Sequence, residues 1–330
     1  MPDVNDYTIG WVCAVEKEHI AAAEFLDEEH GNLDSQPRND NNTYTLGRIG
    51  KHNVVIAILP HWEYGLVSAA NTARDMIRSF PNLRVGLMVG IGGGAPAKHD
   101  IRLGDVVVSS AGYANGGVFQ YDYGKTIQDK EFTYTGFLNK PPTFVMTAVA
   151  SLKSLYKRKG HQLKESITKV LENNPRLQDE YQRPIRSMDI LYKSDYVHSG
   201  EESEDCLESC GNAPSNIIQR RERPTHEDDP AIHYGLIASA NRLMQDALIR
   251  DKLANDKDVL CFEMEAAGLM NQLPFLVVRG ICDYSDTHKN LRWQGYAAMM
   301  AAAYTKDLLN KIAPETLQTE KRLAETLLED

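Results

Sequence analysis

Short apolar runs alternate along the chain with segments whose apolar residues recur at helical spacing. The runs are "YTIGWVCAV", "NVVIAIL", "RVGLMVGIG", "GDVVVSS" and "PFLVVRG". Continuous runs rich in β-branched residues are typical of strands buried on both faces, and their alternation with helical segments favours a mainly parallel sheet. The pattern therefore predicts an α/β fold in which a central mixed, mainly parallel sheet is flanked by helices.

Three segments carry the helical pattern most clearly. The segment from Leu66 to Phe80 places its apolar residues on one stripe and its charged residues elsewhere, which predicts an amphipathic helix lying on the sheet. Residues 144–174 are expected to form two helices divided near Gly160. Residues 295–312 are rich in alanine, a strong helix former, and predict a long helix that packs closely.

The stretch from Pro175 to Pro230 breaks this alternation. It has few apolar runs, many charges and turn-rich pieces such as "SGEESEDCLESCGNAPSN". Because no internal repeat or low-complexity tract is visible, we expect a surface insertion at about 175–230 within a single domain spanning residues 1–312. Residues 313–330 form a charged, helix-prone tail or linker that could lead into a longer chain.

The charge balance narrows the class of partner. The chain has 330 residues, of which 42% are hydrophobic, enough to bury a sizeable core. Its formal net charge of -10 leaves no lysine and arginine excess to neutralise phosphates, which weighs against nucleic acid and anionic membranes as partners. The start lacks the pattern of a signal peptide and no run of about 18 apolar residues occurs, so we expect a cytoplasmic protein.

The five cysteines fit reduced thiols better than a disulfide framework, since three of them (Cys13, Cys261 and Cys282) lie in or beside apolar runs. The other two stand in the insertion as Cys206 and Cys210, near His198. Their spacing is looser than the C-x2-C of most zinc sites, and a fourth ligand such as His226 is not indicated by any pattern. Structural zinc stays an open alternative to a loop with incidental thiols, and we predict no metal and no cofactor.

Carboxylates stand inside segments that otherwise look buried. The stretch "VLCFEMEAAGLMNQLPFLVVRGICDYSD" contains Glu263, Glu265 and Asp283, and burying a carboxylate without a partner is costly. Glu18, in "AVEKEH", and Asp283 each follow a predicted strand, where open α/β sheets build their sites. The alternative for the glutamates is a first-turn position that favours the helix dipole.

A glycine cluster follows another predicted strand. "VGIGGGAP" places four glycines within five positions, which allows backbone N–H groups to approach a ligand oxygen closely. Gly92 and Gly93 are the candidate binding positions. The spacing matches neither a dinucleotide-binding motif nor a P-loop, and a strained turn at a strand end remains the alternative.

Together, "AVEKE", "GIGGG", "FEMEAAG" and "VVRGICDYSD" resemble the nucleoside phosphorylase/nucleosidase superfamily. The resemblance is closest to 5'-methylthioadenosine/S-adenosylhomocysteine nucleosidases and to the similar domain at the N-terminus of many fungal NOD-like receptor proteins. It covers nearly all of residues 7–312, in order. It implies the fold of that superfamily, a purine nucleoside as small-molecule partner and a homodimer or larger homo-oligomer.

The resemblance also implies residue roles. The glutamate at position 265 would bind the ribose hydroxyls, Met264 would pack on the sugar, and Glu263 would help to position them. Asp283 would protonate N7 of the purine as general acid, and Glu18 would activate water. The apolar residues before Asp283 would favour its protonated form.

The residues that would contact the base and the 5' side of the sugar match those of the nucleosidases less closely. In "GLIASANRLMQ", Leu243 and Met244 stand at the base-contacting positions, and Asn241 stands where the nucleosidases have an aspartate. Trp293 matches an aromatic residue that lines the sugar's 5' side. Lys289 and Arg292, nearby, would suit 5'-phosphates of a nucleotide such as ATP, or would simply form a basic loop before a helix.

The sequence favours hydrolysis over phosphorolysis. Phosphorylases that resemble this chain hold phosphate with an arginine and a serine in an R-V-G-S pattern, where this chain has "MVGI", Met88 to Ile91. That difference removes a charge and a hydrogen-bond donor from the anion site. We therefore expect a purine nucleoside N-ribosyl hydrolase acting on adenosine or a related adenine nucleoside or nucleotide. The alternatives are a phosphorylase and a nucleoside-sensing module without turnover.

Overall fold

The apolar runs form strands of a large mixed sheet in the computed structural model, which describes residues 2–33, 35–112, 116–200, 206–270 and 273–327. The predicted strands are β1 (Tyr7–Cys13), β4 (His52–Ile58), β5 (Val85–Gly94), β6 (Val106–Ser109) and β12 (Leu276–Asp283). Further strands are β2 (Glu28–Glu29), β3 (Tyr44–Ile49), β7 (Val118–Gln120), β10 (Ile232–Ser239) and β11 (Val259–Glu263). The expected α/β class, with a mainly parallel sheet, is confirmed.

The sheet runs in the order β11-β10-β6-β12-β5-β1-β4-β3-β2, with β7 beside β10. Neighbours from β12 through β5 and β1 to β4 are parallel, whereas β12 meets β6 and β3 meets β4 in antiparallel fashion. The last residues of β5, Gly93 and Gly94, also pair antiparallel with β11. This second pairing closes β11, β10, β6, β12 and β5 into a ring, which brings the ends of β5, β11 and β12 together.

The predicted helices are confirmed. They are α2 (Leu66–Ser79), the pair α3 (Thr143–Lys159) and α4 (Leu163–Asn173), and α9 (Gln294–Leu309). The other helices are α1 (Glu16–Glu24), α5 (Gln178–Tyr181), α6 (Cys206–Ser209), α7 (Ala247–Lys257), α8 (Ala266–Met270), α10 (Pro314–Thr319) and α11 (Leu323–Thr326). Within the described ranges, no helix is both long and apolar enough to cross a membrane.

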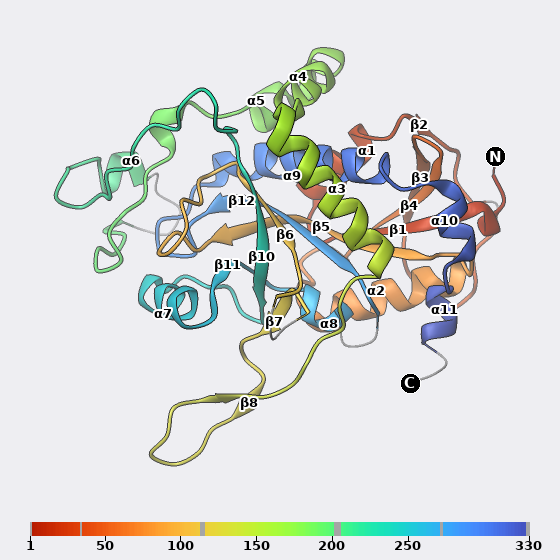
Figure 1. Cartoon of the computed structure of the whole chain (residues 1–330), viewed down its shortest axis with the longest axis horizontal. Coiled ribbons are helices and arrows are strands. Elements are labelled where there is room, and N and C mark those ends of the chain that lie inside the picture. Colours follow the sequence, from red (N-terminus) through yellow and green to blue (C-terminus); the bar gives the residue numbers. More distant parts are fainter. Residues whose placement is uncertain (1, 34, 113–115, 201–205, 271–272, 328–330) are drawn as a thin grey trace.

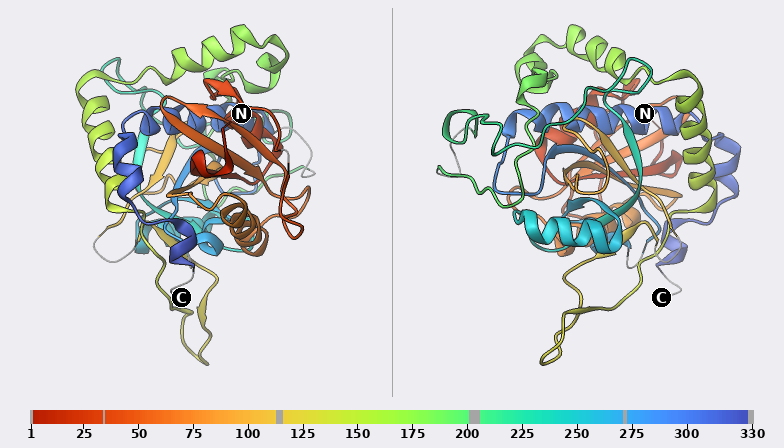
Figure 2. Two further views of the ribbon diagram at one scale, coloured as in Figure 1. Left: turned by 90° about the vertical axis from the view of Figure 1, so that its right-hand side faces the viewer. Right: turned by 60° about the vertical axis from the view of Figure 1, so that its left-hand side comes forward.

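Helices cover both faces of the sheet. Helices α1 and α9 lie over one face, and α2, α7 and α8 lie over the other (Figure 1). Helix α9 approaches β12 so closely that a side chain at Gly280 would collide with the backbone of Ala297. A short hairpin, β8 (Gly124–Lys125) with β9 (Thr133–Tyr134), projects away from the body of the molecule (Figure 2).

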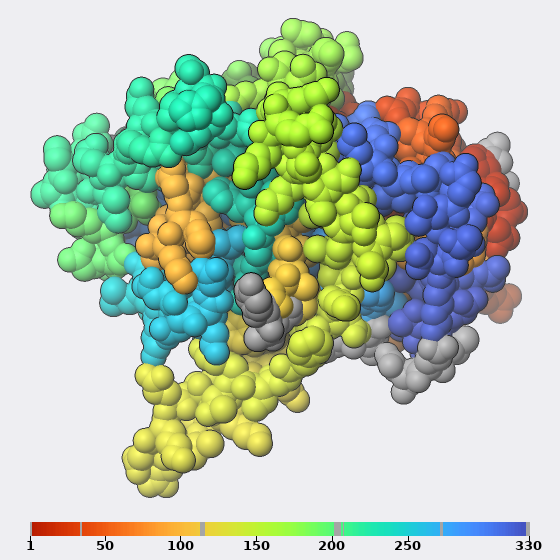
Figure 3. Space-filling view, in the orientation of Figure 1, coloured from red at the N-terminus to blue at the C-terminus, as the bar shows by residue number. Residues whose placement is uncertain are grey.

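The segment 175–230 lies along the flank of the molecule (Figure 3). It contains short helical turns, including α5 and α6, but it is not purely superficial, because Tyr181, Leu191 and Tyr192 are buried. The sequence shows few apolar runs there because isolated large side chains, and not continuous strands, provide the packing.

Asp105, just before β6, anchors this insertion to the sheet. Its carboxylate is fully buried and accepts hydrogen bonds from Arg223 at 2.6 and 2.7 Å, from His233 at 2.8 Å and from the N–H of Ala231 at 2.8 Å. Burial by itself raises the pKa of Asp105, but the hydrogen bonds from Arg223 and His233 lower the pKa to about 2. Asp105 is therefore ionised throughout the neutral range.

Replacing Asp105 should destabilise the protein. Asp105→Asn removes the carboxylate that bonds the buried guanidinium of Arg223 most closely and leaves it only the more distant Asp100 and Asp229, at 3.6 and 3.8 Å, a change that costs about 3 kcal/mol of unfolding free energy. Urea denaturation measures the loss, with Asp179→Asn as control, because Asp179 is an exposed aspartate of the same insertion and its replacement should stay within about 0.5 kcal/mol of wild type. Equal stability of the two variants would contradict the anchoring role.

Candidate active site

A cavity of about 530 Å³ opens where β1, β5, β11 and β12 end. Most of the predicted site residues line it: Glu18, Gly92, Gly93, Leu243, Met244, Glu263, Met264, Glu265 and Asp283. They come from segments far apart in the sequence, and the sheet order brings them together at one edge.

Arg279, which was not among the predicted site residues, lies behind this cavity. Its side chain projects from the middle of β12 and is entirely buried. It donates a hydrogen bond to Glu263 through Nη2, and its Nη atoms lie 3.7 Å from Glu18 and 3.6 Å from Glu265. Burial alone would lower the pKa of Arg279, but the charges of Glu263, Glu18 and Glu265 raise it. The guanidinium explains how the chain buries its acidic residues.

A sequence signal for Arg279 does exist. It is the lone charged residue of the apolar run "FLVVRGIC", and a guanidinium is almost never fully buried unless acids pair with it. Four acidic side chains stand in the same stretch, 259–286. An arginine inside a buried strand, with several acidic residues nearby in sequence, therefore predicts buried ion pairs between them.

Glu18 is held firmly at the start of α1. Its Oε2 accepts hydrogen bonds from the N–H groups of Ala14 at 2.6 Å and Val15 at 3.2 Å, and its Oε1 accepts one from Ile91 at 2.7 Å. Burial raises the pKa of Glu18, against the lowering effects of Arg279 and of these donors. A side chain at Gly90 would collide with the carboxylate of Glu18, so this glycine provides the room for it.

Glu263 and Glu265 have different functions in the fold. Glu263 ends β11, pairs with Arg279 and accepts hydrogen bonds from the N–H groups of Glu265 at 3.1 Å and Ala266 at 3.0 Å, so it caps α8. Glu265 accepts a hydrogen bond from Gly65 at 3.2 Å. Burial, followed by the charge of Glu263, raises the pKa of Glu265 to about 8. Glu265 can therefore change charge near neutral pH.

Asp283, the last residue of β12, lies in a less apolar setting than its sequence neighbours indicate. Its Oδ1 accepts a hydrogen bond from the N–H of Ser285 at 2.8 Å, and Nζ of Lys289 lies 3.6 Å from its Oδ2. The surroundings of Asp283 are thus not purely apolar as expected, because the loop after β12 turns back and places the ammonium group of Lys289 beside the carboxylate. Gly93 leaves room for Asp283, since a side chain there would collide with its Oδ1.

Two predicted residues do not line the cavity. Trp293 is 1% exposed and packs edge-to-face on Tyr296, so it faces the core. Leu291 and Gln294 line the cavity in its place, because Trp293 ends a single helical turn whose side chains point in different directions. Asn241 is exposed, and its backbone N–H binds Asp122 at 2.9 Å. The sequence shows an aromatic or an amide at these positions but not the direction in which it points.

An aromatic rim was also not predicted. His61, Trp62 and Tyr64, in the loop between β4 and α2, line the cavity. Trp62 is 75% exposed and has a φ of 65°, a left-handed conformation that is rare for a bulky residue. The signal in the sequence is "PHWEYG", a turn with three aromatic rings and no apolar run to bury them. Such exposed rings are suited to stacking on a planar ligand.

One relative of this chain is found among curated proteins. No family model matches the chain. A "Nucleotide-binding leucine-rich repeat (NLR)-like protein" of Hyaloscypha variabilis is 45% identical over 318 residues, which is 96% of this chain. The match is 30% of that relative, so this chain spans less than a third of its length.

Solved structures of nucleosidases share the fold. The 5'-methylthioadenosine/S-adenosylhomocysteine nucleosidase of Neisseria meningitidis, in complex with methylthio-immucillin-A, has a TM-score of 0.58 at 14% identity, covering 92% of this chain and 99% of that one. The nucleosidase of the same name and the futalosine hydrolase, both of Helicobacter pylori, have TM-scores of 0.56 at 14% identity and cover 93% of this chain. They cover 100% and 99% of their own chains, respectively. The chain therefore has the fold that these solved nucleosidases share.

Proposed function

We propose that this chain is a purine nucleoside N-ribosyl hydrolase that cleaves adenosine, or a related adenine nucleoside or nucleotide such as ATP, to free base and ribose moiety. The observation that carries the proposal is that Glu18, Glu265 and Asp283 line one cavity. A general base, a sugar-binding carboxylate and a general acid are the groups that hydrolysis of a glycosidic bond requires. The fold shared with solved nucleosidases supports the same reaction class.

Each residue has a defined part in the reaction. Asp283 gives a proton to N7 of the purine, so the base leaves with the electrons of the glycosidic bond. Glu265 accepts hydrogen bonds from the ribose hydroxyls while the sugar becomes an oxocarbenium-like cation. Water then bonds to the anomeric carbon, and Glu18 takes its proton.

The geometry of Glu18 suits a base that acts on water. Oε2 is occupied by two backbone N–H groups, but Oε1 accepts only the N–H of Ile91 among the described residues and keeps a lone pair. Nη1 of Arg279, 3.7 Å from this oxygen, has no hydrogen-bond partner in the described part of the chain. Through this lone pair, Oε1 can accept a hydrogen bond from a water molecule in the cavity and then take its proton.

Phosphorolysis is disfavoured by the same wall of the cavity. Met88 is fully buried, and Ile91 presents a hydrocarbon side chain where an anion site needs donors. Glu18 would repel phosphate at this position. A sensor without turnover is also disfavoured, because binding alone needs no acid and base facing one ligand.

A nucleotide is a candidate substrate because cations line the cavity as well. Lys17, Arg242 and Lys289 all contribute to its wall. Their charges would complement 5'-phosphates, whereas adenosine offers no such anion. Arg292, which the sequence pairs with Lys289, is exposed and is not part of the lining.

Replacing either proposed catalytic carboxylate should abolish turnover and spare binding. Asp283→Asn and Glu18→Gln should each lower kcat by about 100-fold or more, the scale of lost general acid or base catalysis. Chromatography of released base measures the rate, and calorimetry measures nucleoside binding. Asp179→Asn is the control for handling and folding. Near wild-type turnover in either variant would remove that residue from its role.

Lys289 and Arg292 should differ in their effect on nucleotides. Lys289→Ala removes a cation from the cavity wall and should raise KM for ATP relative to adenosine, whereas Arg292→Ala should leave that ratio unchanged. The ratio decides the question, because Lys289 also faces Asp283 and its loss can slow both substrates. If Lys289→Ala changes ATP and adenosine cleavage equally, it does not bind 5'-phosphates.

Glu265 should make the stability of the ligand-free protein depend on pH. Its pKa is near 4.5 in an unfolded chain and is raised to about 8 in the folded state. The folded protein therefore holds this proton more tightly, which stabilises it fully below pH 4.5, and this stabilisation is lost as the pH rises towards 8. The stability of Glu265→Gln relative to wild type should therefore increase by about 1 kcal/mol per pH unit between pH 5.5 and 8, then level off.

Urea denaturation across that pH range measures the difference. Glu315→Gln is the control, because Glu315 is an exposed glutamate of α10 whose replacement should show no such trend. A difference between Glu265→Gln and wild type that stays constant with pH would show that Glu265 is ionised throughout.

A further inference from the structure

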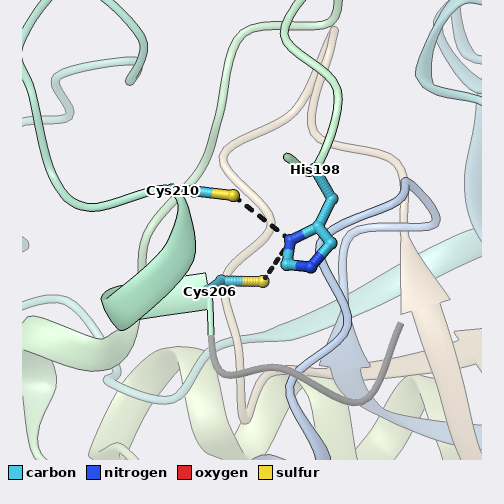
Figure 4. A group of neighbouring side chains, drawn as sticks. All are labelled: His198, Cys206 and Cys210. Atoms are coloured by element: carbon cyan, nitrogen blue, oxygen red, sulfur yellow. Dashed lines mark hydrogen bonds between the residues drawn. The ribbon is translucent and has the colours of Figure 1, made fainter. Parts of the chain in front are cut away.

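A histidine and two cysteines of the insertion converge beside the loop that follows β12. His198, Cys206 and Cys210 point toward one another in Figure 4, and their ligand atoms all lie within 4.8 Å of one another. The N–H of Cys210 bonds to the carbonyl of Cys206 at 2.9 Å, which closes a helical turn and puts both thiols on one face. Cys210 is buried, and Cys206 and His198 are partly buried.

Hydrogen bonds to His198 account poorly for the positions of both thiols. Both sulfur atoms face the same ring nitrogen, Nδ1 of His198, with Cys206 at 3.4 Å and Cys210 at 3.2 Å. A ring nitrogen has a single lone pair or a single proton, so it cannot form two good bonds with two thiols. The thiol is, moreover, a weak donor.

A tetrahedral metal ion fits the same distances. Zinc binds thiolate sulfur at about 2.3 Å and imidazole nitrogen at about 2.0 Å, so a tetrahedral site separates sulfur from nitrogen by about 3.5 Å. The observed separations, 3.2 and 3.4 Å, are close to that spacing. Two thiolates and a neutral imidazole also neutralise the charge of a divalent ion.

We propose that His198, through Nδ1, and the thiolates of Cys206 and Cys210 bind a zinc ion, with the fourth position open to water or a further ligand. Soft thiolates with imidazole select zinc over the hard cations magnesium and calcium. The site contrasts with the sequence prediction of no metal, which rested on the loose C-x3-C spacing and on the lack of an indicated fourth ligand. In a helical turn that spacing places both sulfur atoms on one face, so it serves as well as C-x2-C. His226, the fourth ligand considered from the sequence, is not part of the cluster.

The zinc site would fasten the insertion to the loop that carries Lys289. The backbone N–H of His198 donates to Oγ1 of Thr287 at 2.8 Å, and the ring of His198 meets the ring of His288 edge-to-face at 5.9 Å. Sγ of Cys206 lies 3.7 Å from the carbonyl oxygen of Lys289. A metal ion that fixes His198, Cys206 and Cys210 therefore also orders residues 287–289, beside the cavity.

Metal analysis tests the proposal directly. The protein is purified without chelator, its zinc content per chain is measured by mass spectrometry, and the double variant Cys206→Ser with Cys210→Ser is treated alike. We expect about one zinc per chain in wild type, the stoichiometry of a single site, and at least tenfold less in the double variant. His226→Ala is the control, because it removes an exposed histidine of the same insertion, and it should keep its zinc.

A second measurement keeps the test independent of how the variants fold. Metal-stripped wild type is titrated with Co²⁺, which should give the absorption of thiolate-bound tetrahedral cobalt, and hydrogen exchange is followed with and without Zn²⁺. Zinc should slow exchange in residues 286–291 and leave β12 unchanged. Wild type that contains no zinc and binds no Co²⁺ would overturn the proposal. The proposal would also be overturned if the double variant retained its zinc, or if protein purified under reducing conditions contained a Cys206–Cys210 disulfide.

Discussion

The buried guanidinium of Arg279 is the interaction on which the rest of the site depends. Glu18, Glu263 and Glu265 could not all be buried beside one another without it, because each would face two like charges in a medium that solvates none of them. Arg279 lies within reach of all three. Burial nevertheless raises the pKa values of Glu18 and Glu265, and the charge of Glu263 raises that of Glu265 further. Glu265, whose pKa is raised to about 8, can therefore exchange a proton near neutral pH.

The backbone is adapted to the same cluster. The glycines of β5 were interpreted from the sequence as positions where N–H groups approach a ligand, but Gly90 and Gly93 also leave space for the carboxylates of Glu18 and Asp283. The pairing of Gly93 and Gly94 with β11 closes the ring of strands and brings Glu263 towards Arg279. The glycine-rich motif therefore serves the fold and the acidic cluster at once.

Much of this structure could be predicted from the sequence, where signals are local and periodic. The buried strands and the amphipathic stripe of α2 have strong patterns, and residues at strand ends converge because parallel strands end at one edge. Strand β10 was missed, since "GLIAS" was interpreted only as part of the base-contacting segment "GLIASANRLMQ". The inward direction of Trp293 and the approach of Glu18 to Arg279 depend on tertiary contacts that no single window of sequence contains.

The measurement that tests the central claim most directly is chromatography of the products formed from adenosine, inosine, guanosine and ATP, each with and without inorganic phosphate. Hydrolysis at a site built from Glu18, Glu265 and Asp283 predicts free adenine and a ribose moiety without phosphate, from adenosine, ATP or both. Base released only with phosphate, together with ribose-1-phosphate, would contradict the roles assigned to Glu18 and Ile91. No base from any substrate would contradict catalysis itself.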